Sequence, residues 1–187
     1  MNTEVAGGTV KERLAGHPSD RLFSYNYEQL IACGEGRMHG PHFPPLPVPP
    51  MLMFDEITKI DPVGGAHEKG YLEARLTVRP DLWFFGCHFK FDPVMPGCLG
   101  LDALWQLLGF YLGWRGAQGR GRALGAKEVK FTGQILPENK EVIYKVEMQR
   151  VKTAPLYMGI GDGEVIADGK KLYDVKGLKV GVMPVES

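Results

Sequence analysis

Residues 94–114, VMPGCLGLDALWQLLGFYLGW, decide how this 187-residue chain folds. The stretch has one charged residue, Asp102, and a helix formed by it would be apolar on nearly every side. Such a helix belongs either in a membrane or beneath a sheet that covers it. The less apolar residues fall along one side of it: Cys98, Asp102, Trp105, Gln106 and Gly109.

A membrane span is the first alternative to test, because residues 98–114 would extend for about 25 Å at about 1.5 Å per residue. Asp102 and Gln106 lie within the stretch, Pro96 and Gly97 open it, and the chain has no second apolar run of this length. These features favour a helix buried in a protein core.

The composition is that of a globular domain, with 44% hydrophobic and 24% charged residues and no net charge. It gives no global reason to bind nucleic acid or an anionic membrane surface. Three cysteines make an odd number, and the first twenty residues lack an apolar signal-peptide core, so we predict a cytoplasmic protein. Residues 1–22 are polar and unpatterned, which predicts a flexible N-terminal extension before a single domain at 23–187.

The pattern around the central stretch predicts an α+β fold, in which an antiparallel sheet wraps around one long apolar helix. A short helix is expected over 25–33, with Ser24 as N-cap and Gly34 at its end. The proline-rich stretch 41–50 is expected to run extended as a packed connector, the alternative being a proline-motif ligand. Asp168-Gly169 is a hairpin signal. The expected strands cover 51–60, 71–78, 123–132, 141–151, 156–167 and 170–183.

His88 and Asp102 are the first candidates for chemistry. A buried carboxylate without a partner is costly, so a core helix is not expected to keep one without a reason. A histidine in this apolar neighbourhood is, taken alone, more simply a core residue bonded to backbone. Histidine nevertheless exchanges protons near neutral pH, and beside an acidic Asp102 it would form a matched base and acid.

Pro96 and Gly97 supply a third element of a site. They open the predicted helix, whose first-turn N–H groups have no partner within the helix and favour negative charge. An enolate or oxyanion forming at a thioester or ester carbonyl would be stabilised there. Base, acid and N–H donors together describe removal of a proton next to a carbonyl with loss of a β-hydroxyl.

Two other chemistries use the same residues. Zinc-ligand residue types are present at Cys87, His88, Cys98 and Asp102, but their spacing is not that of a metal site. Cys98 at a helix start is a candidate nucleophile, although a small residue packing there explains it as well.

The run from Asp81 to Gln106, with MLMFDEI before it and EVKFTGQILP after it, resembles the β-hydroxyacyl acyl-carrier-protein dehydratases, in particular the 3-hydroxydecanoyl dehydratase/isomerase type. The similarity extends from about Tyr27 to Met183. It implies the hotdog fold and a homodimer whose active sites are shared between subunits.

The resemblance also assigns roles. It implies that His88 is the catalytic base, that Asp102 is its acidic partner and that the Gly97 N–H polarises the thioester carbonyl, with Val94, Cys98 and Trp105 as further substrate-binding residues. Aspartate rather than glutamate at 102 favours the bifunctional type, which dehydrates a 3-hydroxyacyl chain to the trans-2-enoyl form and isomerises it to cis-3. The resemblance implies acyl carrier protein as the partner, and it implies no metal or organic cofactor. Phe91 departs from the family's usual glycine, which puts chain-length preference in question.

Two other functions stay open from the sequence: an acyl-thioester hydrolase in which Asp102 activates water, and a non-catalytic acyl-chain binding protein. Because the carrier protein is acidic, an exposed basic patch is expected beside the site. The candidates are Arg115, Arg120, Arg122, Arg150 and Lys152.

Overall fold

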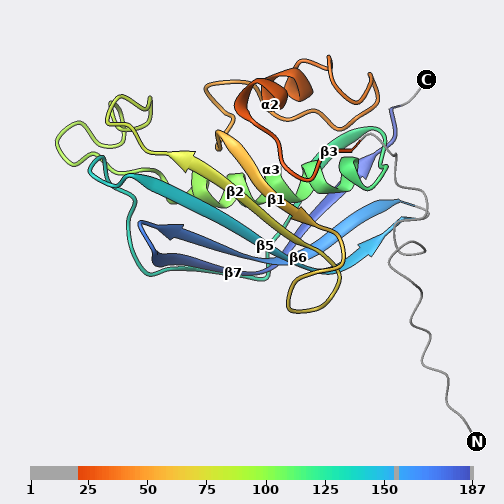
Figure 1. Cartoon of the computed structure of the whole chain (residues 1–187). Coiled ribbons are helices and arrows are strands. Elements are labelled where there is room, and N and C mark those ends of the chain that lie inside the picture. The colour runs from red at the N-terminus through yellow and green to blue at the C-terminus, as the bar shows by residue number, and fades with distance from the viewer. Residues whose placement is uncertain (1–20, 154–155, 186–187) are drawn as a thin grey trace, which may run out of the picture.

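Helix α3 (Gly97–Trp114) packs against a seven-stranded sheet in the computed structural model, which describes residues 21–153 and 156–185 (Figure 1). Glycines on β6 (Tyr157–Ala167) allow the close approach. A Cβ atom at Gly159 would lie 2.6 Å from the Leu108 side chain, and one at Gly163 would lie 2.7 Å from Leu104. The prediction of a buried core helix is therefore confirmed. In the described part of the chain, no helix combines the length and apolarity needed to cross a membrane.

The sheet is antiparallel throughout, in the order β1-β2-β5-β6-β7-β3, with β4 also paired to β7. Its inward residues alternate with outward ones, as in β2, where Leu72, Ala74 and Leu76 are buried. The predicted α+β class and the sheet around a helix are confirmed. The strands are β1 (Glu56–Asp61), β2 (Tyr71–Thr77), β3 (Arg120–Gly125), β4 (Glu128–Phe131), β5 (Glu141–Lys152), β6 (Tyr157–Ala167) and β7 (Lys170–Met183).

The single strand predicted over 123–132 is wrong, because two short strands occupy this region. Strand β3 pairs with residues 179–183 of β7, and β4 pairs with residues 173–176. Between these two parts of β7 lies Gly177, with φ of +63°, and β3 ends at Gly125, with φ of +137°. The two left-handed glycines interrupt the extended conformation, so one edge of β7 is covered by two strands.

The first predicted strand is shorter than expected, because β1 begins at Glu56 and not at Met51. The backbone of Met51 and Met53 is instead bonded to the Gln106 side chain of α3. The hairpin at Asp168-Gly169 is confirmed, with positive φ at both residues between β6 and β7.

The predicted short helix is present as α2 (Tyr27–Gly34), but its N-cap is Asn26 and not Ser24. Asn26 and Gln29 form a reciprocal capping box, with side-chain to backbone distances of 2.9 and 3.0 Å. Ser24 lies two residues too early for this arrangement. Figure 1 shows α3 between the sheet and the segment that carries α2.

The proline-rich stretch is a packed connector, as predicted. Phe43 and Leu46 are buried, and a Cβ at Gly113 of α3 would lie 2.8 Å from the Pro44 side chain. The predicted extension at 1–22 lies outside the described residues except for Arg21 and Leu22. The Leu22 carbonyl accepts a 2.7 Å hydrogen bond from the indole N–H of Trp114.

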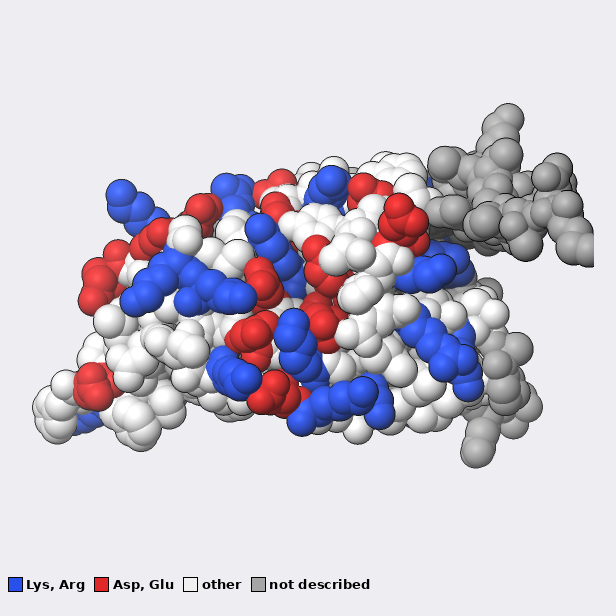
Figure 2. Space-filling view, turned by 90° about the horizontal axis from the view of Figure 1, so that it is seen from below, with Lys and Arg blue, Asp and Glu red and all other residues white. Residues whose placement is uncertain are grey.

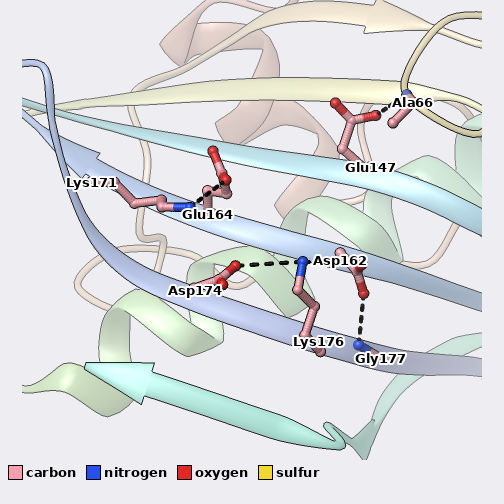
Figure 3. A network of polar contacts seen from close by, with 8 residues as sticks. All are labelled: Ala66, Glu147, Asp162, Glu164, Lys171, Asp174, Lys176 and Gly177. Carbon is pink, nitrogen blue, oxygen red and sulfur yellow. Dashed lines mark hydrogen bonds and ion pairs between the residues drawn. The ribbon is translucent and has the colours of Figure 1, made fainter. Parts of the chain in front are cut away.

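The outer face of the sheet carries interspersed charges of both signs (Figure 2). Figure 3 shows part of it, where Asp162 on β6 accepts a 2.9 Å bond from the Gly177 N–H and contacts the Lys176 ammonium at 3.4 Å. Lys171 and Glu164 pair in the same way at 3.0 Å. These partly exposed pairs mark a solvated face of the sheet.

Candidate active site

The loop between β2 and α3 fixes the orientation of the His88 ring and determines which ring nitrogen carries the proton. The His88 N–H donates to the Phe84 carbonyl at 2.8 Å, and the Val94 N–H donates to the His88 carbonyl at 2.8 Å. The ring nitrogen Nδ1 lies 2.9 Å from the Val94 carbonyl oxygen. Because a carbonyl only accepts, Nδ1 carries the proton, and in the neutral ring Nε2 is left as a proton acceptor.

His88 lines a largely apolar cavity of about 610 Å³. The Phe89 ring stacks on the imidazole, with centroids 4.1 Å apart. Three of the predicted substrate-binding residues line the same cavity: Val94, Gly97 and Cys98. Its other lining residues are Phe89, Met95, Leu101, Val129, Phe131, Gly133, Gln134 and Tyr173. The cavity thus places the His88 imidazole beside space suited to an apolar chain.

Gly97 is the first residue of α3, with Pro96 as its N-cap. The Leu99 N–H is engaged with the Pro96 carbonyl at 2.9 Å. A Cβ at position 97 would lie 2.9 Å from Cε1 of Phe131, another cavity residue. Glycine is therefore required for the present packing, in which the backbone of the first helical turn borders the cavity.

Tyr173 contributes a buried phenol to this cavity. Burial, together with the neighbouring Cys98 thiol, raises the Tyr173 pKa to about 12. The phenol therefore stays protonated across physiological pH. It also sets the shape of the cavity, because a Cβ at Gly100 would lie 2.5 Å from its ring.

Asp102 lies one turn after Cys98 and lines a second cavity, of about 380 Å³. Trp105, predicted with the substrate-binding residues, lies here as well, and its indole N–H donates to the Gly125 carbonyl at 3.3 Å. The walls come from the proline-rich connector, at residues 44–47, and from residues 121–123 of β3. Within one chain, His88 and Asp102 therefore line different cavities.

Gln106 holds the Asp102 carboxylate in place, a role that the sequence reasoning did not assign. Its Oε1 accepts from the Met53 N–H at 3.1 Å, which fixes the orientation of the amide. Its Nε2 then donates to the Met51 carbonyl at 2.9 Å and to Oδ2 of Asp102 at 2.6 Å. The signal available in the sequence was a polar residue four positions after Asp102 on the same helix side.

In the residues that the structure describes, no three His, Cys, Asp or Glu side chains gather in an arrangement that could hold a metal ion. The chemical groups that the geometry supplies are therefore an oriented imidazole, helix-terminal N–H groups and a carboxylate held by an amide.

The fold of this chain is similar to that of several solved structures. One is a chain of the dehydratase heterocomplex ApeI:P from Xenorhabdus doucetiae, with 17% identity, a TM-score of 0.55 and coverage of 73% of this chain and 86% of that one. Another is Cj0977, a sigma28-regulated virulence protein from Campylobacter jejuni, at 8% identity, with a TM-score of 0.51 and coverage of 75% and 82%. A third is the uncharacterized protein PH1136 from Pyrococcus horikoshii, at 11% identity, with a TM-score of 0.51 and coverage of 72% and 86%. At these identities the likeness establishes the fold, which is the hotdog fold.

The family follows from the sequence match. Residues 46–176 match the FabA-like domain, and the chain belongs to this family. The match covers the His88 loop, α3 and most of the sheet, and the family commonly comprises dehydratases.

Proposed function

We propose that this protein is a hydro-lyase with enoyl isomerase activity, acting on 3-hydroxyacyl chains of about decanoyl length carried by acyl carrier protein. The observation that carries the proposal is the His88 imidazole, held by the Val94 carbonyl at 2.9 Å beside an apolar cavity that the start of α3 also borders. Membership of the FabA-like family and the resemblance of the Asp81–Gln106 run support the same reaction.

The proposed dehydration uses each group once. Nε2 of His88 takes a proton from the carbon next to the thioester carbonyl, while the Gly97 N–H and the positive end of α3 stabilise the negative charge on the carbonyl oxygen. Asp102 in its acid form gives a proton to the β-hydroxyl, which leaves as water. Exchange with solvent then removes the proton from His88 and returns one to Asp102, so that the base is free for the next step. Because Gln106 donates to Oδ2, the proton of Asp102 belongs on Oδ1.

The proposed isomerisation uses the same groups without a net loss of atoms. The base removes a proton from the carbon beyond the trans-2 double bond, and a proton returns to the carbon next to the carbonyl, which leaves the cis-3 product. Both steps pass through an enolate-like state, so one base and one oxyanion site serve both.

The site as proposed needs two copies of the chain. His88 and Asp102 line different cavities in one chain, although both cavities border the side of α3 that the sheet leaves partly exposed. Strand β3 is the last strand in the sheet order, and its outer edge has no further strand among the described residues. Leu124 on β3 is 46% exposed, and Phe131 on β4 is 53% exposed. A homodimer joined at this edge would set His88 of one protomer against Asp102 of the partner subunit.

A cationic surface near the end of β3 suits an acidic carrier protein. Strand pairing aligns Lys152 with Met158, Gly181 and Arg122 across four strands. Two positions further along the strands, another row contains Arg150, Ile160 and Lys179. In the described part of the chain these four cations form no ion pair. We call this group the basic patch: Arg122, Arg150, Lys152 and Lys179.

The predicted cations fall into two sets. Arg122, Arg150 and Lys152 belong to the basic patch, and Arg120 is exposed two residues earlier on β3. Arg115 is engaged elsewhere, because its guanidinium donates to the Tyr111 hydroxyl at 3.1 Å. The cations of the basic patch, which form no ion pair in the described part of the chain, favour capture of an anionic partner.

The proposal is tested with purified protein and 3-hydroxydecanoyl thioesters, by separating the trans-2 and cis-3 products. We expect His88→Ala and Asp102→Asn each to lower dehydration by about 10²–10⁴-fold, because each removes a proton-transfer group. Matched controls are His67→Ala and Asp81→Asn, which change the same residue types at exposed loop positions and should leave turnover unchanged. Circular dichroism and thermal melting confirm that the variants are folded.

Other outcomes assign the alternatives. Wild-type turnover in His88→Ala would contradict the proposed mechanism. Release of free carrier thiol instead of an enoyl product would identify an acyl-thioester hydrolase. Retained lipid without any turnover would identify an acyl-chain binding protein.

A further inference from the structure

A separate cavity lies at the opposite end of α3 from the His88 cavity. It has a volume of about 470 Å³ and is lined by Arg21, by residues 39–43 and by the 116–118 turn that follows α3. The His88 cavity borders the first turns of α3 at Gly97–Leu101. At about 1.5 Å per residue, the two cavities are about 25 Å apart along the helix. We call this site the Arg21 cavity.

Arg21 brings a positive charge into this cavity without an acceptor to match it. Two guanidinium nitrogens, Nε and Nη1, are buried and have no hydrogen-bond partner in the described structure. The guanidinium lies 5.2 Å from the centre of the Phe43 ring, which supports its flat face but accepts no conventional hydrogen bond. Arginine keeps its proton at all physiological pH values, so it cannot lose this charge on burial. A buried donor of this kind calls for an anionic acceptor.

In the described structure, Nε and Nη1 of Arg21 make no hydrogen bond to the neighbouring backbone. Near the end of α3, the carbonyls of Tyr111, Leu112 and Gly113 accept N–H bonds of 2.8–2.9 Å from residues 115–117. The His42 carbonyl accepts a 2.7 Å bond from Gly119. No aspartate or glutamate is among the described residues that line the cavity.

The other polar groups at this cavity are also donors or can become donors. The His42 imidazole and the Gln118 side-chain amide lie at exposed positions on its border. His39 also lines the cavity, and its ring packs against Phe43 with centroids 4.9 Å apart. A guanidinium, an imidazole N–H and an amide N–H together can donate to several oxygens of one tetrahedral oxyanion. Phe43 and Ala117 provide apolar walls, and the volume exceeds that of a bare phosphate.

We infer that the Arg21 cavity binds a phosphate monoester of a small organic molecule, with Arg21 as the main ligand to the phosphate. The bound phosphate would connect the segment before α2 with the turn after α3, two regions far apart in sequence. Binding therefore stabilises the folded chain by mass action. The inference does not depend on the proposed dehydratase reaction, because it uses none of the residues assigned to that site.

The test measures binding to the full chain by isothermal titration calorimetry and thermal melting, at constant ionic strength. The probes are inorganic phosphate, phenyl phosphate and benzoate. We expect phenyl phosphate to bind more tightly than phosphate, and benzoate to bind most weakly. Each phosphate should raise the melting temperature of the wild-type chain.

Arg21→Met keeps a long apolar side chain over Phe43 and removes all the guanidinium donors. We expect at least a tenfold loss of phenyl phosphate affinity, whereas the melting temperature in phosphate-free buffer should not fall, because the orphaned buried donors are gone. Arg79→Gln is the matched control, since Arg79 is an exposed arginine whose removal should leave binding unchanged. Dehydration of a small thioester should be equal in Arg21→Met and wild type.

Three results would overturn the inference: no binding of either phosphate, equal phosphate affinity in wild type and Arg21→Met, or tightest binding of benzoate. If Arg21→Met fails to fold, His42→Leu and Gln118→Leu replace it at the exposed border of the cavity. Each should weaken phenyl phosphate binding, and unchanged affinity in both would then reject the site.

Discussion

Mixing two inactive variants tests how the proposed active site is assembled. One chain carries His88→Ala and the other Asp102→Asn. Because the two residues line different cavities of one chain, the proposed site takes its base from one protomer and its acid from the other. A dimer of two different variants then has one site with both groups intact and one site with neither.

The expected activity follows from counting sites. Each single variant alone lacks an essential group in every site and is about 10²–10⁴-fold less active than wild type. Random exchange at equal amounts makes half of the dimers mixed, and each mixed dimer has one working site of two, so about a quarter of wild-type activity should return. This recovery stands far above the residual activity of either variant.

The assay is dehydration of a 3-hydroxydecanoyl thioester after co-expression of the two chains with different affinity tags. Sequential purification on both tags isolates the mixed dimer, which should show about half of wild-type activity per dimer. The control pairs His88→Ala with the His88→Ala, Asp102→Asn double variant, in which no site has both groups. An inactive mixed dimer, shown to contain both tags and to be folded, would refute a site shared between protomers.

Three further outcomes are expected. Reversing Arg150 and Lys152 to glutamate should weaken carrier-protein binding while turnover of a small thioester is kept, because neither residue lines the His88 or Asp102 cavity. Unchanged binding would place the carrier elsewhere. Gln106→Leu should lower the free energy of unfolding by about 1–3 kcal/mol, because the backbone partners of the amide are left unpaired. It should also lower kcat with a smaller change in KM, because Asp102 loses the amide that holds it. Chemical denaturation measures the first effect and steady-state kinetics the second. For Asp168, hydrogen bonds from the Asn139 amide and two backbone N–H groups lower the pKa below its ordinary 3.8. The hydrogen bonds to the ionised Asp168 therefore stabilise the fold at pH values above 3.8, and this stabilisation is lost as the pH falls through the lower pKa of the folded state. The melting temperature of Asp168→Asn should be below that of wild type at pH 7, and the two should converge in acid.

Short-range patterns were enough to predict the scaffold. A helix that is apolar on nearly every side must be covered, and alternating strands before and after it provide the cover, so Gly97–Trp114 and the antiparallel sheet could be inferred from periodicity. The turn at Asp168-Gly169 could be predicted in the same way, because a two-residue hairpin turn needs residues that accept positive φ, and these two residues do. The same local logic placed α2, although it chose Ser24 over Asn26 as the cap.

The tertiary structure alone decided which side chains meet. Helical spacing puts Cys98 and Asp102 on one side of α3, but it cannot show that the first borders the His88 cavity and the second a cavity closed by the proline-rich connector. The hydrogen bonds between the Gln106 side chain and the backbone of Met51 and Met53 join segments more than fifty residues apart. Periodicity and local motifs could not predict them. Likewise, the division of 123–132 into β3 and β4 depends on the irregularity of β7 at Gly177, which separates the parts paired with β3 and with β4. Strand pairing is a long-range contact, and its register depends on both strands.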